Sequence, residues 1–280
     1  MLDGVIEDFG DCRHVGISGL ANLAGGQTCC AAGLIVFVGV AGYHCGILSI
    51  KTSLKIDGLL GMTLENQTTN HLQGYSKQVD ELREIGRLFY SRGWSVGTSS
   101  NYSQVVSRQP LEILITASGK DKGNLTAEDF VCVGEDAKPV SPGQPKSSAE
   151  TWLHVVAAAN NSQVGSVLHT HSVWGTLLSD LFFSAGGFWI EGYEMLKGLE
   201  GVTTHEHRQW VPIYENTQDI PSLAEQVKPE FTNPTHPPLH GFLIRNHGLY
   251  TWGKDVFAAR RHVEIFEFLF ECTARRRQLA

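Results

Sequence analysis

Hydrophobic residues recur at helical spacing in two well-separated segments of the chain. Between residues 76 and 93, apolar side chains alternate with charged ones at intervals of three and four positions, which predicts an amphipathic helix. Ser76 is expected to cap this helix and Gly93 to end it. Residues 255–275 repeat the pattern and predict a longer helix with one apolar face.

Short apolar runs between these two helices predict strands. They cover residues 111–115, 164–172, 241–244 and 249–252. Further helices are predicted over residues 150–160 and 220–227. Helices and strands interleave without a strict strand–helix–strand repeat. This arrangement favours an α/β fold of three layers, an α/β/α sandwich around a central mostly antiparallel or mixed sheet.

The N-terminal part of the chain, residues 1–72, has a different composition. It is rich in glycine, and it contains no Asp, Glu, Lys or Arg between Arg13 and Lys51. The run over residues 31–50 is long enough to cross a bilayer, but it contains four glycines and His44. Acidic residues precede it, where a secretory signal requires positive charge. We therefore expect an apolar, glycine-rich extension that is not a membrane anchor.

Residues 73–280 are expected to form one globular domain, and Met62, shortly before it, is the expected functional start. Of the 280 residues, 42% are hydrophobic and 18% are charged, which excludes a disordered or fibrous protein. The net charge of −7 argues against nucleic-acid binding, which requires a basic excess. The six cysteines show no CxxC spacing, which predicts free thiols in a reducing compartment.

Two histidines, His169 and His171, come at the end of an apolar strand. Residues i and i+2 of a strand project to the same side, so both imidazoles can reach one ion. His247, at a strand end before a glycine, is the best candidate for a third ligand. Three neutral imidazoles with an open position are typical of catalytic zinc, although Fe and Mn accept the same ligands. A second pair, His205 and His207, lies in a polar stretch and is expected to be exposed or near the substrate.

Three small-residue segments have the composition of anion sites. Residues 97–101 offer backbone N–H groups and a side-chain amide, and residues 118–120 lie at the exit of a predicted strand. Ser147 and Ser148 precede a predicted helix, whose N-terminal amides can bind a phosphate group, and Lys146 precedes them. Serine and glycine clusters of this kind are also typical of ordinary turns, so each segment alone is weak evidence.

Several strings of the chain together match one protein family. They are GTSSNYS, ITASGKDKG, PKSSAETWLH, VGSVLHTHS, EGYEMLKGLEG, VPIYENTQDI and IRNHGLYTWGKD. Over residues 76–275, in this order, the chain resembles the class II aldolase/adducin family. The resemblance implies a catalytic domain over residues 73–280, with one Zn²⁺ per subunit and a small phosphorylated ketose as substrate. It also implies a cytoplasmic homotetramer.

The resemblance further implies roles for single residues. Zinc would be bound by the three histidines named above, His169, His171 and His247. Glu194 would be the acid/base residue, which requires that burial raise its pKa towards neutrality. Glu150 matches a catalytic glutamate of the family's aldolases. The family's phosphate contacts correspond to Asn101, Ser118, Gly119, Ser147 and Ser148. The chain departs from the family at residue 100, where it has serine and many members have glycine.

Within the family, the EMLKG and ENTQDI strings favour the enzymes of methionine salvage that dehydrate a 1-phosphoketose. Zinc would stabilise the enediolate formed at C2 and C3, and a carboxylate would help to expel the C4 hydroxyl as water. An aldolase or 4-epimerase acting on another sugar phosphate would use the same zinc to break the C3–C4 bond. A non-catalytic adducin-like module is a further alternative, against which the three histidines argue. No nucleic-acid or membrane partner is expected.

Overall fold

The computed structural model describes residues 20–23, 27–30, 72, 74–232 and 239–279. The chain divides into two units, residues 1–65 and 66–280. In the first unit, β1 (Leu20–Leu23) and β2 (Gln27–Cys30) pair antiparallel. The run over residues 31–50 and the expected start at Met62 lie outside the described residues. Across the described ranges, no helix is both long and apolar enough to cross a membrane.

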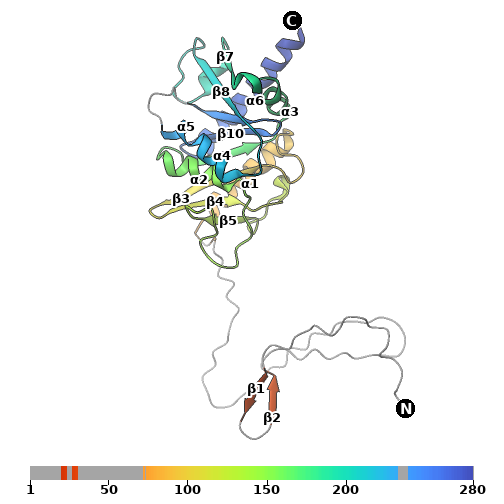
Figure 1. The fold of residues 1–280 in the computed structure, drawn as a ribbon, viewed down its shortest axis with the longest axis vertical. Helices are drawn as coiled ribbons and strands as arrows, with labels where there is room; N and C mark the ends of the chain where they lie inside the picture. Colours follow the sequence, from red (N-terminus) through yellow and green to blue (C-terminus); the bar gives the residue numbers. More distant parts are fainter. Residues whose placement is uncertain (1–19, 24–26, 31–71, 73, 233–238, 280) are drawn as a thin grey trace, which may run out of the picture. The chain divides into compact units, whose positions relative to one another are not determined.

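The second unit is built on an eight-stranded sheet, whose order is β5-β4-β3-β6-β10-β9-β8-β7 (Figure 1). The strands are β3 (Asn101–Arg108), β4 (Leu111–Thr116), β5 (Phe130–Val133), β6 (Ser166–Thr170), β7 (Gly187–Glu191), β8 (Arg208–Tyr214), β9 (Gly241–Ile244) and β10 (Gly248–Gly253). Every neighbouring pair is antiparallel except β8 and β9, which run parallel. The sheet is therefore mixed and mostly antiparallel, which confirms the prediction.

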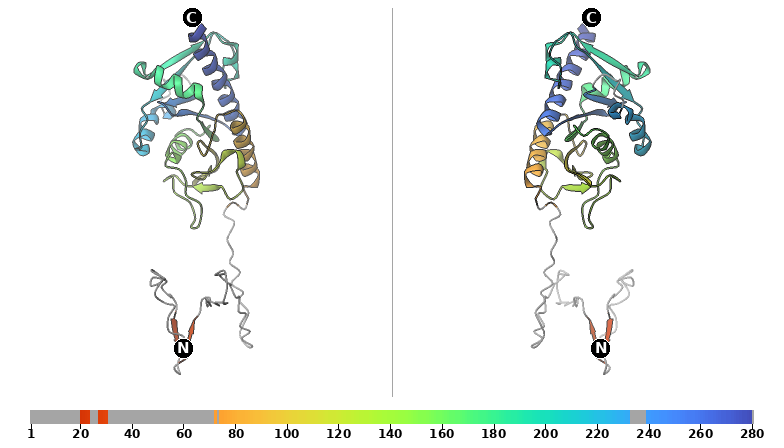
Figure 2. Two further views of the ribbon diagram at one scale, coloured as in Figure 1. Left: turned by 90° about the vertical axis from the view of Figure 1, so that its right-hand side faces the viewer. Right: turned by 90° about the vertical axis from the view of Figure 1, so that its left-hand side faces the viewer.

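Helices cover both faces of this sheet. They are α1 (Ser76–Ser91), α2 (Thr151–Asn160), α3 (Val173–Leu181), α4 (Ile220–Val227), α5 (Pro229–Thr232) and α6 (Val256–Leu279), with short 3-10 helices η2 (Lys122–Asn124), η3 (Phe183–Ala185) and η4 (Glu194–Gly198). Buried residues of α1, α3 and α6 pack on one face, and those of α2 and α4 pack on the other (Figure 2). The predicted three-layer sandwich is thus present.

The predicted elements are found with ends shifted by a few residues, but one cap was wrong. Ser76 is the first residue of α1, and the N-cap is Tyr75, which makes no side-chain cap hydrogen bond. Gly93 does end the helix, with a φ of 74°. Strand β3 was not predicted, because its first three residues belong to the small polar string GTSSNYS, which is typical of a turn. The first four residues of β3 are nevertheless buried, because the strand lies inside the sheet between β4 and β6.

The central strands align three side chains across the sheet. Asn101 of β3 lies opposite His169 of β6, and His169 lies opposite Tyr250 of β10. Directly opposed residues project to the same face. That face is covered by α2, since Tyr250 packs in the same cluster as apolar residues of α2. Glu150, at the N-terminus of α2, therefore lies over this row.

Candidate metal centre and substrate cleft

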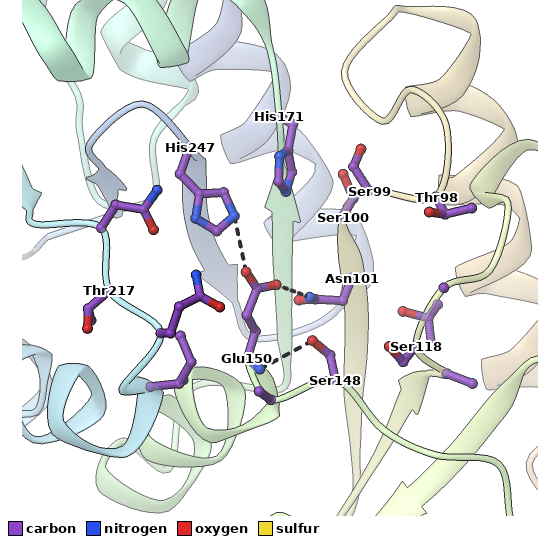
Figure 3. Close-up of a pocket in the computed structure, with 17 residues that line it drawn as sticks. Thr98, Ser99, Ser100, Asn101, Ser118, Ser148, Glu150, His171, Thr217 and His247 are labelled. Atoms are coloured by element: carbon purple, nitrogen blue, oxygen red, sulfur yellow. Dashed lines mark hydrogen bonds and ion pairs between the residues drawn. The ribbon is translucent and has the colours of Figure 1, made fainter.

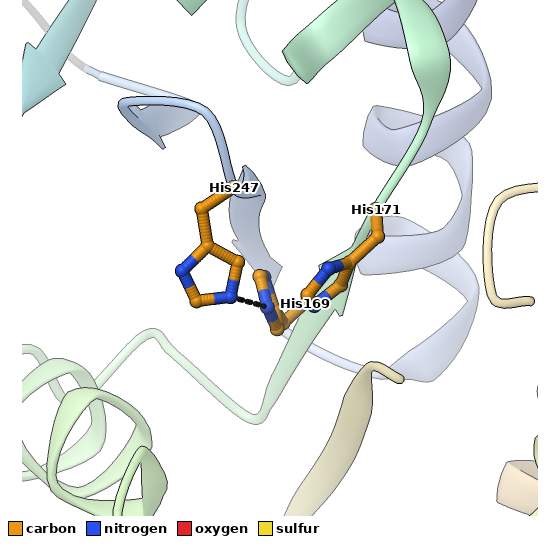
Figure 4. A group of neighbouring side chains, drawn as sticks. All are labelled: His169, His171 and His247. Carbon is orange, nitrogen blue, oxygen red and sulfur yellow. Dashed lines mark hydrogen bonds between the residues drawn. The ribbon is translucent and has the colours of Figure 1, made fainter. Parts of the chain in front are cut away.

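Three histidines distant in the sequence lie together at the end of β6 and in the turn between β9 and β10 (Figure 4). One nitrogen of each of His169, His171 and His247 lies within 4.8 Å of the others. The Nε2 atoms of His169 and His247 are 3.3 Å apart. The structure thus brings together the three residues that the sequence singled out, in a geometry that suits a single metal ion.

The orientation of His169 is fixed by its surroundings. Its Nδ1 lies 2.9 Å from the carbonyl oxygen of Leu249, which can only accept, so Nδ1 carries the proton and Nε2 offers its lone pair to the cluster. The ring of Tyr250 stacks on the imidazole at 4.0 Å. Burial, with a contribution from His171, lowers the pKa of His169 well below its usual value.

His171, the second candidate ligand, is also neutral. Burial lowers the pKa of His171 to about 4, and the neighbouring His247 adds to this effect. Neutral imidazole is the form that binds metals. The donor set of the cluster therefore fits a borderline divalent cation such as zinc.

Glu150 completes the cluster (Figure 3). Its Oε1 lies 3.1 Å from Nε2 of His247, and its Oε2 accepts a hydrogen bond of 2.6 Å from Nδ2 of Asn101. Oε2 also lies 3.9 Å from Nε2 of His169. Burial opposes ionisation of this carboxyl, but the two histidines and Asn101 outweigh it and lower the pKa of Glu150. The side chain is an anion that faces the histidines, where a carboxylate can serve as a further metal ligand or as a base.

A buried chain of hydrogen bonds holds Asn101 in place. The amide oxygen of Asn101 accepts from Nε2 of His154, and Nδ1 of His154 lies 2.8 Å from the hydroxyl of Ser103. Because the amide oxygen only accepts, His154 carries its proton on Nε2, and Ser103 donates to Nδ1. Burial lowers the pKa of His154 to about 3, which keeps the ring neutral. This order of donors leaves the amide NH₂ of Asn101 directed at Glu150.

The sequence contained a signal for His154 that was missed. The residue lies on the buried face of an apolar helix, where an imidazole requires partners.

A cleft of about 300 Å³ opens beside the histidines. Figure 3 shows its walls, with residues 98–101 and 116–119 on one side and residues 216–218 on the other. Asn101, Ser118, Gly119 and Ser148 line the cleft as expected, together with Glu150. The wall at residues 216–218 was not predicted, although it belongs to the ENTQDI string.

Two of the predicted site residues lie outside the cleft. Ser147 is not among the residues lining the cleft, and its hydroxyl donates to the carbonyl of Ala137 at 3.4 Å. Glu194 lies on η4 with 67% of its side chain exposed, where it pairs with Lys197 and lies 3.7 Å from Nδ1 of His205. The hydrogen bond from Lys197 lowers the pKa of Glu194. The burial that was expected to raise this pKa is therefore absent within the single chain.

Comparison with known sequences identifies close relatives. Residues 80–274 match the family described as Class II Aldolase and Adducin N-terminal domain. The chain is 46% identical over 198 residues to the methylthioribulose-1-phosphate dehydratase of Marinobacter nauticus, covering 71% of this chain and 93% of that protein. It is 48% identical over 197 residues to the enzyme of the same name from Pseudomonas syringae pv. syringae, covering 70% and 94%.

Solved structures share the fold at lower identity. An L-fuculose 1-phosphate aldolase superposes with a TM-score of 0.60 at 19% identity, covering 73% of this chain and 88% of that one. The L-fuculose-1-phosphate aldolase of Thermus thermophilus superposes with a TM-score of 0.57 at 20% identity, covering 73% and 97%. These two similarities support the fold alone.

Proposed function

The chain belongs to the class II aldolase and adducin family, and from this premise we propose that it is a zinc-dependent methylthioribulose-1-phosphate dehydratase. The reaction converts 5-methylthioribulose 1-phosphate to 2,3-diketo-5-methylthiopentyl 1-phosphate and water, a step of methionine salvage. The observation that carries the proposal is an identity of 46% to 48% over more than nine-tenths of the length of relatives with this name.

In this proposal, His169, His171 and His247 hold the metal. When bound, zinc supplies a Lewis acid that stabilises negative charge on the ketose oxygens. The carboxylate of Glu150 faces this position and is held by Asn101, so we assign to it the removal of the C3 proton. The C4 hydroxyl then leaves as water, and the resulting enol becomes the 2,3-diketone.

Glu194 keeps its proposed role as an acid/base residue, on the strength of the resemblance. It lies outside the cleft of its own chain, so it can reach a substrate only if another subunit brings the two together. The proposed homotetramer would allow this.

The free thiols of Cys132 and Cys272 support the proposed cytoplasmic location, where thiols stay reduced.

The phosphate group is proposed to bind at residues 98–101 and 118–119, with Ser147 and Ser148 nearby. Ser100 supports this placement, because the residue is only 8% exposed and its hydroxyl makes no hydrogen bond of normal geometry. A buried hydroxyl without a partner is unfavourable, and a bound phosphate oxygen would supply one. Its φ of 72° lies in the region that glycine favours, which agrees with glycine at this position in many family members.

The proposal is tested by incubating the zinc-loaded protein with 5-methylthioribulose 1-phosphate. Dehydration gives diketone absorbance without release of an aldehyde. Release of an aldehyde would instead support an aldolase, in which the C3–C4 bond breaks. Absence of any turnover by a fully metal-loaded protein would favour the non-catalytic alternative.

A further inference from the structure

The cleft contains no cationic side chain of the kind that usually binds a phosphate group. Among the described residues that line it there is no lysine and no arginine, and Glu150 adds a negative charge. A phosphomonoester carries nearly two negative charges at neutral pH. If the cleft binds such a group, a cation behind its walls adds to the positive charge that a metal ion on the histidines would supply.

Lys122 lies directly behind the wall formed by residues 98–101 and 116–119. It is the first residue of η2 and is only 1% exposed. Its Nζ donates to the carbonyl oxygen of Lys120 at 2.7 Å and to that of Thr98 at 3.4 Å. Thr98 lines the cleft, and Lys120 directly follows Gly119, which also lines it. The ammonium group therefore bridges the backbones of the two loops.

This lysine is held in place by tight backbone packing. A Cβ atom at Gly86 of α1 would lie 2.3 Å from the carbonyl oxygen of Lys122. A Cβ atom at Gly123 would lie 2.9 Å from the ring of Tyr90. Glycine at both positions lets α1 press on this turn. The two hydrogen bonds of Nζ hold the side chain beneath the loops, whereas most lysines extend their ammonium group to solvent.

Its charge is poorly compensated by the protein. Within the described part of the chain, no carboxylate lies within ion-pair distance of Nζ, since Asp129 pairs with Lys120 instead. Burial lowers the pKa of Lys122 to about 8, although three carboxylates act in the opposite direction, those of Asp121, Asp129 and Glu150. A buried cation without a paired anion is unfavourable. The hydroxyl of Ser100, in the same wall, is also buried and makes no hydrogen bond of normal geometry.

We propose that Lys122 supplies the positive charge of a phosphomonoester subsite in this cleft, acting through the backbone of the two loops and without touching the ligand. The inference rests on the proposed function in taking a phosphate ester as the substrate. It makes Lys122 a positioning residue for anion binding, whose loss affects affinity for the phosphate group more than the chemical step.

The test is calorimetric titration of inorganic phosphate into the zinc-loaded full-length protein and its variants. Lys122→Met keeps the length of the side chain and removes the charge, and it is expected to weaken phosphate binding by roughly tenfold or more. Lys122→Arg keeps the charge and is expected to lose less affinity. Lys138→Met is the matched control, because it removes a charge that is 78% exposed, paired with Asp136 and not part of the cleft lining, and it is expected to bind within about twofold of wild type.

Two results would overturn the inference. One is Lys122→Met binding phosphate as tightly as wild type. The other is equal loss by the Arg and Met variants, because this would show that shape, and not charge, is responsible. If Lys122→Met does not fold, Lys122→Gln replaces it in the comparison with Lys122→Arg. Phosphate binding is measured without turnover, so failure of the dehydratase assay and failure of this inference are distinguishable.

Discussion

Replacing His154 with leucine should disable the site without touching any residue that faces the cleft. The substitution removes the N–H group that donates to the amide oxygen of Asn101. Asn101 is only 3% exposed, and among the described residues no other group donates to this oxygen. A buried polar group left without its partner costs about 1–3 kcal/mol of unfolding free energy. Ser103 loses less, because its hydroxyl can still donate to the carbonyl of Val167 at 3.4 Å.

The catalytic effect should exceed the effect on stability. Without His154, the amide of Asn101 is free to rotate, and Glu150 loses a hydrogen bond of fixed direction. Misplacement of a reacting group by about 1 Å can cost roughly 100-fold in rate, so we expect kcat to fall about 10-fold to 100-fold with little change in KM. His154→Gln can place an amide N–H near the position of Nε2, and it is expected to recover most of the rate.

The assay compares kcat and KM with unfolding free energy from denaturant titration. His262→Leu is a matched control, because His262 is an equally buried histidine with two backbone partners, Trp252 and Glu200, and it does not line the cleft. It should lose stability and keep kcat. The reasoning is refuted if His154→Leu keeps the kcat of wild type, or if both variants lose kcat to the same degree.

Three further predictions concern pH and backbone strain. Burial lowers the pKa of His240 and of His262 to about 4, so between pH 6.5 and pH 4 these histidines are protonated in the unfolded chain only. The unfolding free energy of the metal-free protein should therefore fall as the pH is lowered over this range. A denaturation midpoint that stays constant over the range would contradict this. Burial raises the pKa of Glu267 to about 7, so the contribution of this residue to stability falls as the pH rises from 4.5 to 7. Glu267→Gln should therefore be about 1–3 kcal/mol more stable than wild type at pH 8. Equal stability of the two proteins at pH 8 would disprove this prediction. Ser100→Gly relieves the backbone strain of a φ of 72° and should raise the unfolding free energy by up to about 1 kcal/mol, as measured by melting curves. The same substitution should weaken phosphate binding, as measured by calorimetry. Unchanged phosphate affinity would count against a role for the Ser100 hydroxyl.

The layers of the fold could be predicted from the sequence because their signals are local. The helical period of α1 and α6 and the apolar runs of β4, β6 and β9 depend on neighbouring residues only. Strand β3 gives no such signal. Asn101 is polar because it faces the site, and the strand conformation of residues 101–104 is imposed by pairing with β6.

The candidate site was predicted in part for the same reason. His169 and His171 are two positions apart on one strand, so their common direction follows from the period of the strand. The proximity of His247 depends on the antiparallel pairing of β10 with β6, which no local pattern specifies. The contacts of His154 and the burial of Lys122 depend on packing between distant segments, so they became visible only in three dimensions.

Metal content of the purified protein tests the account most directly, because every proposed role near the cleft depends on the histidine cluster. Elemental analysis should find one zinc ion per chain in wild type and none in His247→Ala, with both proteins folded by circular dichroism. A folded wild type that retains no metal after zinc loading, or a His247→Ala variant that retains a full equivalent, would contradict it.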